Sequence, residues 1–185
     1  APSAPAPEVA AAPPSNPSGL RPTEAVVTTE IRALISVPDD TAAMPEDGWP
    51  LILFLHGAGE RGEDLERVAT WGPPRLVAAG ETLPCIVLAP QCPEGLWWEP
   101  SSLLSLLDRV MEQQTVDPDR VIVTGLSMGG YGTLDLVATA PERFAAAVPI
   151  CGGLPKPLLL APALARVPLW LFHGTDDRIV PLSES

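Results

Sequence analysis

A serine between two glycines is the residue of this sequence best suited to covalent chemistry. The sequence GLSMG at 125–129 has the pattern G-x-S-x-G, directly after the apolar run 121–124 and directly before a stretch with a helical pattern. A serine on such a sharp strand-to-helix turn has an exposed hydroxyl, and the flanking glycines avoid clashes with the neighbouring strand and helix. The pattern alone is weak, but in this context it predicts that Ser127 is a nucleophile rather than a structural turn residue.

Two backbone segments are suited to stabilise the oxyanion that attack by Ser127 would create. The N–H of Met128 comes directly after the nucleophile, at the positive N-terminal end of the next helix. The loop HGAGERG at 56–62 follows an earlier apolar run, and its small residues let the backbone approach a substrate carbonyl. Ala58 or Gly59 is the predicted donor in this loop.

The larger side chains of the same loop are expected to hold it in place. His56 is predicted to anchor the loop by side-chain hydrogen bonds rather than to act as a base. Glu60 and Arg61 are predicted to form an ion pair that stabilises the loop, with a substrate contact as the alternative.

An acidic pair follows the last apolar run, in the sequence FHGTDDRIVP at 172–181. An acid that comes after the nucleophile fits the chain order Ser…Asp…His, in which it holds the histidine in the correct tautomer. For Asp176 and Asp177 taken singly, a solvated turn is the alternative.

The elements that must position these residues alternate between two types. Runs that are apolar at every residue indicate strands covered on both faces, and they occur at 51–55, 85–89, 121–124, 145–150 and 168–172. The β-branched stretch 25–37 indicates an N-terminal strand or hairpin, and helical patterns cover 101–114, 129–140 and 158–166. This alternation predicts an α/β fold with a mostly parallel, doubly wound sheet.

The first of these helices carries explicit boundary signals. Ser101 or Ser102 is the predicted N-cap, and Asp117-Pro118 is expected to end the segment.

The N-terminal segment differs in composition from the rest. Residues 1–22 contain seven prolines and much Ala and Ser, which predicts an extended linker that forms no packed core. The α/β domain is expected to cover 23–185. The Pro/Ala-rich segment and the absence of a starting Met favour a periplasmic or extracellular protein.

Composition excludes several classes of partner. The net charge of −12 argues against nucleic acid and anionic membrane surfaces, which need clustered basic residues. The apolar stretch 157–172 contains Arg166 and three prolines and is too short to span a bilayer. Three cysteines without a CxxC pair and only two histidines make a zinc site unexpected, and no metal or organic cofactor is predicted.

Together these motifs resemble a known family. HGAGERG, WGPP, APQCP followed by Trp, GLSMGGYGT, PICGG and HGTDDRIVP occur in the order seen in the predicted-peptidase or dienelactone-hydrolase-like esterase branch of the α/β-hydrolases. Feruloyl and carbohydrate esterases, polyhydroxybutyrate-depolymerase-like proteins and prolyl oligopeptidase catalytic domains are related to this branch. The resemblance implies Ser127 as nucleophile and, from the pattern H-G-x-x-D, Asp177 rather than Asp176 as the acid.

The family that these motifs resemble also has elements for which this sequence contains no matching residues. The family's catalytic histidine follows one further strand, and neither His56 nor His173 is at the matching position. The last strand, a helix and the base are therefore expected to be missing, so that the domain is incomplete at its C-terminus.

The function implied by the resemblance is hydrolysis of carboxylic esters through an acyl-enzyme on Ser127. The expected substrates are small-molecule or carbohydrate-linked esters, and Trp97, Trp98 and Tyr131 either line the substrate pocket or pack in the core or rim. A serine peptidase of the same fold and a catalytically inactive binding module are the alternatives. The sequence does not predict an oligomeric state.

Overall fold

The protein forms a mixed sheet of five strands in the order β1-β3-β2-β4-β5. The computed structural model describes residues 31–39, 44–154 and 157–185, so the predicted linker 1–22 lies outside the described residues. The strands are β1 (Ala33–Ser36), β2 (Trp49–Leu55), β3 (Ile86–Pro90), β4 (Val116–Leu126) and β5 (Ala146–Ile150). Only β1 runs antiparallel to its neighbour, which confirms the prediction of a mostly parallel sheet.

The adjacent strands β2 and β3 are apolar at every residue, as expected for strands that are covered on both faces. All five residues of β3 are buried, and Leu51, Leu53 and Leu55 of β2 have no exposed surface. Burial on both faces is the usual reason for such continuous apolar runs in parallel sheets.

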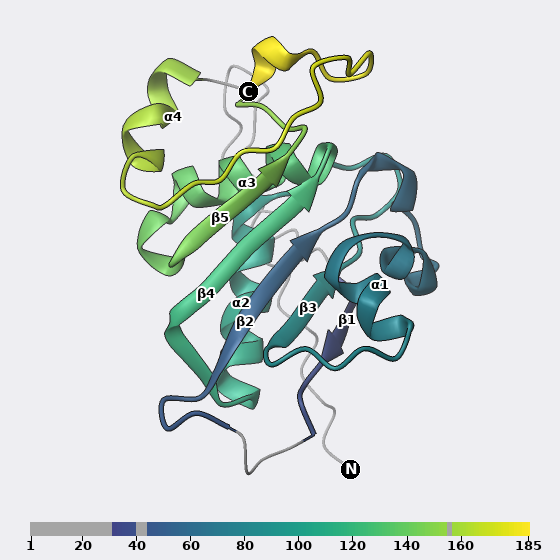
Figure 1. The fold of residues 1–185 in the computed structure, drawn as a ribbon, viewed down its shortest axis with the longest axis vertical. Coiled ribbons are helices and arrows are strands. Elements are labelled where there is room, and N and C mark those ends of the chain that lie inside the picture. The colour runs from purple at the N-terminus through teal and green to yellow at the C-terminus, as the bar shows by residue number, and fades with distance from the viewer. Residues whose placement is uncertain (1–30, 40–43, 155–156) are drawn as a thin grey trace, which may run out of the picture.

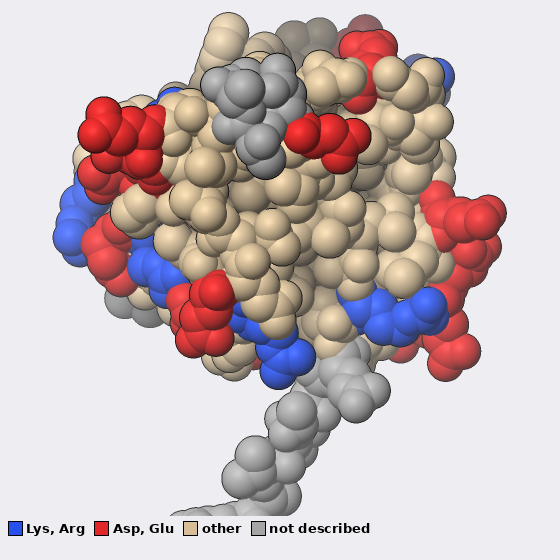
Figure 2. All heavy atoms as spheres, turned by 90° about the horizontal axis from the view of Figure 1, so that it is seen from below, with Lys and Arg blue, Asp and Glu red and all other residues tan. Residues whose placement is uncertain are grey.

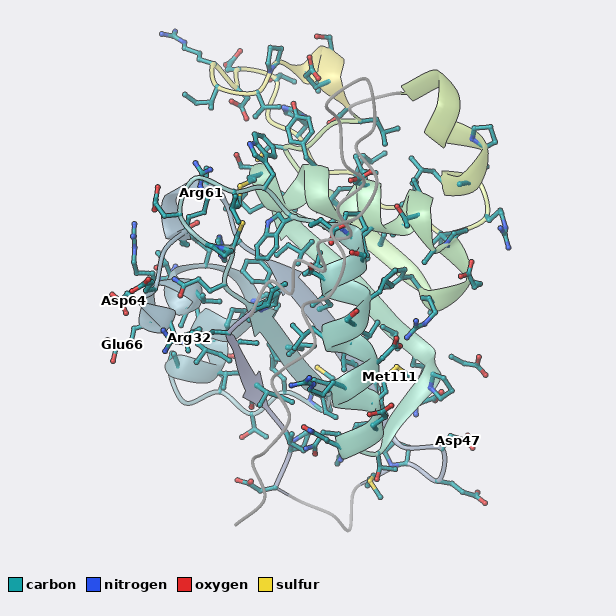
Figure 3. All side chains as sticks on the ribbon, turned by 180° about the vertical axis from the view of Figure 1, so that it is seen from behind. Arg32, Asp47, Arg61, Asp64, Glu66 and Met111 are labelled. Atoms are coloured by element: carbon teal, nitrogen blue, oxygen red, sulfur yellow. The ribbon has the colours of Figure 1, made fainter. Side chains whose placement is uncertain are left out.

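Helices lie on both faces of the sheet. On one face α2 (Pro100–Gln113) and α3 (Met128–Thr139) pack side by side, and on the other face lies α1 (Gly72–Ala78), as Figures 1 and 3 show from opposite sides. A further helix, α4 (Pro157–Leu164), lies beside α3 near the end of the chain. The carboxyl ends of β2, β4 and β5 meet at the upper edge of the sheet in Figure 1, where the candidate site residues follow them.

Several predicted boundaries were wrong. The N-cap of α2 is Glu99, whose carboxylate accepts from the N–H groups of Ser101 and Ser102, so these serines lie inside the helix. The helix ends at Gln113, and Asp117-Pro118 belongs to β4 rather than ending the helix. Of the predicted strand 25–37, residues 31–37 are described, and only 33–36 of these form a strand, β1.

The segment 168–172 pairs with β5 without forming a complete strand. It makes parallel bridges between Ala147 and Leu169 and between Ile150 and Phe172. The N–H groups of Trp170 and Phe172 donate to β5 carbonyls at 3.0 and 3.1 Å. The predicted fifth apolar run therefore continues the sheet beyond β5.

Acidic and basic side chains share the end of the molecule opposite the candidate site. Figure 2 shows this end, with red and blue groups around its rim and mostly uncharged atoms at its centre. Within the described residues, no helix combines the length and apolarity needed to cross a membrane.

Candidate active site

Ser127 lies on a strained turn between β4 and α3. Its backbone has φ 56° and ψ −115°, a positive φ that residues other than glycine rarely adopt. The turn is held on both sides, because the Ser127 N–H donates to Ile150 O at 2.9 Å and its carbonyl accepts from Tyr131 N at 3.1 Å. The structure thus places Ser127 between the end of a buried strand and the first turn of a helix, as the sequence predicts.

The glycines around Ser127 are required by close backbone packing. A Cβ on Gly129 would lie 1.9 Å from the carbonyl oxygen of Leu55, and one on Gly125 would lie 2.3 Å from the carbonyl oxygen of Gly129. Both distances are far below any van der Waals contact. The start of α3 can approach β2 and β4 this closely only because side chains are absent at these positions.

The loop after β2 lies next to this turn. A Cβ on the buried Gly57 would lie 3.5 Å from Leu126 O and 3.8 Å from Ser127 Cβ, so the loop backbone passes close to the candidate nucleophile. Ala58 and Gly59, which form a 3-10 turn with Glu60, are exposed. The structure therefore brings together the two predicted oxyanion segments, this loop and the N-terminus of α3.

His56 anchors the loop, as predicted. Its Nε2 accepts the N–H of Cys92 at 2.9 Å, so the proton of the neutral ring is on Nδ1, which lies 2.6 Å from Gly57 O. Burial lowers the pKa of His56 below its ordinary value, and the ring is therefore neutral at pH 7. Both ring nitrogens are engaged by backbone groups other than Ser127.

The predicted ion pair between Glu60 and Arg61 was wrong. Glu60 Oε1 instead accepts from the indole N–H of Trp71 at 3.2 Å. Arg61 donates to the carbonyls of Ala58 and Leu96 at 3.1 and 3.0 Å. These backbone carbonyls bind the Arg61 guanidinium in place of the Glu60 carboxylate.

Two further residues that hold the loop were missed from the sequence. Arg67 donates to the carbonyls of Gly59 and Arg61, and Gln91 Nε2 donates to Glu60 O at 3.0 Å and Asp64 O at 2.6 Å. Figure 3 shows Arg61 on the same side of the molecule as Arg32, Asp64 and Glu66. These contacts join residues from separate elements, so no local pattern predicts them. The only hint in the sequence was that Gln91 belongs to the motif APQCP.

The neighbouring residues Asp176 and Asp177 have different surroundings. Asp177 Oδ1 accepts from the N–H groups of Ile179 at 2.8 Å and Val180 at 3.0 Å, and these bonds hold the pKa of the carboxyl below its ordinary value. Asp176 is exposed. Asp177 is thus the ordered carboxylate of the two, with Oδ2 lying 3.7 Å from His173 Nε2.

His173 is also engaged in local contacts. Its Nε2 lies 2.8 Å from Val180 O, and its Nδ1 lies 2.7 Å from the hydroxyl oxygen of Ser185. His56 and His173 are the only histidines of the sequence. The contacts described above direct no ring nitrogen of either one towards Ser127.

The three candidate pocket aromatics lie in different environments. Trp98 belongs to the core: it is 7% exposed, packs edge-on against His56 and donates to His56 O at 3.2 Å. Trp97 is 63% exposed and lies against Tyr131, with ring centroids 6.1 Å apart. The exposed Trp97 thus lies against the half-buried Tyr131 of α3, and Trp98 does not belong to this pair.

Among the described residues, no group of three or more His, Cys, Asp or Glu side chains could hold a metal ion. Cys85, Cys92 and Cys151 are free thiols. Burial raises the pKa of Cys92 to about 11, so this thiol stays protonated at neutral pH.

Comparison with known proteins agrees with this arrangement. The model of the Prolyl oligopeptidase family matches residues 98–154, which include the turn at Ser127. A solved structure of a thermostable esterase is 35% identical, with a TM-score of 0.68 over 84% of this chain. The acetyl xylan esterase from Aspergillus awamori, 19% identical, superposes with a TM-score of 0.64 over 84% of the chain. The chain has the α/β-hydrolase fold.

The chain's sequence relatives include a depolymerase and esterases. Poly(3-hydroxyalkanoate) depolymerase C of Paucimonas lemoignei is 33% identical over 129 residues, which are 60% of this chain and 30% of the depolymerase. The thermostable esterase is covered to 46% of its length. The chain therefore spans less than half the length of both proteins.

Proposed function

We propose that the protein is a serine hydrolase that cleaves carboxylic esters through an acyl-enzyme on Ser127. The observation that carries the proposal is the backbone of Ser127, held at φ 56° between a strand and a helix by two hydrogen bonds. A protein maintains such strain at a serine only where the surrounding structure enforces it, and strained residues cluster at active sites. The likeness to esterases adds support.

In the proposed reaction, Ser127 Oγ attacks the ester carbonyl and the carbonyl oxygen becomes an oxyanion. The N–H of Met128, at the positive end of α3, and an N–H of Ala58 or Gly59 donate to this oxygen. The alcohol leaves as the acyl-enzyme forms, and water then releases the acid. No step requires a metal or an organic cofactor.

The acid of the proposed triad is Asp177. Its Oδ1 is occupied by two backbone N–H groups, which fix the carboxylate and keep it ionised, and its Oδ2 remains the oxygen suited to accept from a histidine. Because the contacts of both His56 and His173 engage their ring nitrogens elsewhere, we assign neither histidine as the general base.

The proposed substrates are small-molecule or carbohydrate-linked esters. An acetyl xylan esterase is among the structures with the same fold, although at 19% identity it supports the fold alone. The exposed Trp97 and the half-buried Tyr131 of α3 form an aromatic pair, suited to contact an acyl or alcohol group at the rim. The composition of segment 1–22 favours an exported protein.

A serine peptidase is the second candidate, since the match to the Prolyl oligopeptidase family covers residues 98–154. Both activities use the same nucleophile and oxyanion donors. Comparing p-nitrophenyl esters with the matching p-nitroanilides separates them, and turnover of the anilide alone would favour the peptidase.

The nucleophile assignment is tested in the full-length protein. Ser127→Ala should reduce kcat on a short p-nitrophenyl ester by about 10⁴- to 10⁶-fold, because the covalent step is lost. A fluorophosphonate probe should label Ser127 and no other serine, as read by peptide mass spectrometry. Labelling at another serine, or full activity of Ser127→Ala, would exclude the proposal.

A further inference from the structure

Consecutive carbonyls of the loop after β2 each accept a hydrogen bond from a side chain. Gly57 O accepts from His56, Ala58 O from Arg61, Gly59 O from Arg67, Glu60 O from Gln91, and Arg61 O again from Arg67. A trans peptide is planar, so its N–H points opposite to its C=O. Fixing the carbonyls on one side therefore fixes the direction of the loop N–H groups on the other.

One series of these bonds runs from a guanidinium to a candidate oxyanion donor. Arg67 donates to the Gly59 carbonyl, and the same peptide unit carries the Glu60 N–H. The Glu60 N–H donates to Gly57 O at 3.4 Å, and the peptide unit of that carbonyl carries the Ala58 N–H. All donors point in one direction along this series, from the charged side chain towards Ala58.

The Gly57 carbonyl receives a second donor. His56 Nδ1–H lies 2.6 Å from this oxygen, and its tautomer is fixed because Nε2 accepts the Cys92 N–H. The peptide unit between Gly57 and Ala58 is thus held by two donors. Among the described residues, the unit between Ala58 and Gly59 is held by Arg61 alone.

We propose that Arg67 is a positioning residue that orients and polarises the Ala58 N–H as the loop's oxyanion donor. This proposal rests on the proposed function and deepens it, because it chooses Ala58 over Gly59. Bonds from a charged donor are stronger than neutral ones, and donors aligned in series polarise one another. A polarised N–H that is already in place stabilises developing negative charge without reorganisation during the reaction.

The test compares Arg67→Met with Arg75→Met in the full-length protein. Arg75 is an exposed arginine on α1 and serves as the matched control. Arg67→Met should lower kcat on a p-nitrophenyl ester about 10-fold or more with little change in KM, since a transition-state interaction is weakened. Affinity for a trifluoromethyl ketone, whose adduct with serine carries an oxyanion, should fall by the same factor. Affinity for the product acid should not change.

Two further variants make the outcomes distinct. Arg67→Lys keeps the charge and should recover part of kcat, and Ser127→Ala reports on the proposed function itself. An Arg67→Met enzyme within twofold of the unmodified kcat, beside an inactive Ser127→Ala, would overturn this inference alone. If Arg67→Met weakened product and ketone binding by the same factor and also lowered the melting temperature, Arg67 would be merely structural. That result would also overturn this inference. An active Ser127→Ala would instead overturn the proposed function.

Discussion

Single residues in this molecule acquire their roles from the backbone groups around them. Asp176 and Asp177 are neighbours of the same type, but Asp176 is exposed while Asp177 accepts two backbone N–H groups. His56 is neutral because it is buried between two backbone partners. Residue type marks a candidate, and the surrounding hydrogen bonds decide what that candidate can do.

The two aspartates should differ in their effect on catalysis. Asp177→Asn in the full-length protein should lower kcat/KM by at least about 10²-fold, because an amide can no longer stabilise an imidazolium. Asp176→Asn, the adjacent control, should change it little. Ester hydrolysis by the two purified variants is the measurement, and the reverse ranking would mean that Asp176 is the acid.

At the scale of elements, the sequence predicted strands and the long helices better than their ends. β2 and β3 are continuous apolar runs covered on both faces, and a pattern search detects such runs directly. The short helix α1 was missed because Gly-Pro-Pro resembles a loop, although proline is favoured at the first positions of a helix. Likewise, Glu99 is an uncommon N-cap residue, and serine was the expected choice.

The candidate site, too, was predicted only in part from the sequence. The turn at Ser127 and the loop at 56–62 follow from glycine spacing, which is local information. The partners of that loop, Arg67 and Gln91, come from other elements and depend on tertiary packing that no spacing encodes. The wrong ion pair between Glu60 and Arg61 has the same cause, since backbone carbonyls compete for the guanidinium.

The contact between α3 and β2 should not tolerate a side chain at Gly129. A Cβ there would lie 1.9 Å from Leu55 O, so Gly129→Ala must separate the helix from the strand. The free energy of unfolding should fall by at least about 3 kcal/mol. Urea unfolding followed by circular dichroism measures this effect, with Gly174→Ala as control because a Cβ at Gly174 meets nothing within 4 Å. Equal stability of the two variants would contradict the packing described.

At the scale of the whole molecule, the sheet is well covered over its centre and apolar at one border. Trp170, Leu171 and Phe172, the border residues, are 68%, 44% and 42% exposed, and the rings of Trp170 and Phe172 are 4.8 Å apart. The N–H groups of Trp170 and Phe172 point to β5, so alternation directs that of Leu171 away from the sheet. Exposed apolar edges of this kind promote pairing between chains.

The chain 1–185 should therefore associate in a concentration-dependent manner through the border residues. Replacing Trp170 and Leu171 together by Arg and Lys should shift the protein toward the monomer, because charge at an edge opposes pairing. Size-exclusion chromatography with light scattering measures the mass. Leu76→Arg on α1, where Leu76 is 40% exposed, is the control for added charge. A mass that stays monomeric at every concentration for the unmodified chain would contradict the prediction.

The loop after β2 also has a practical consequence for protein engineering. Its conformation depends on carbonyls bound by His56, Arg61, Arg67 and Gln91, while Ala58 is exposed and a Cβ at Gly59 would meet nothing within 4 Å. Side chains at 58 and 59 can therefore be varied in a mutant library without rebuilding the loop beneath them. Under the proposed function, selectivity for the group bound beside Ser127 could then be redesigned from these two surface positions.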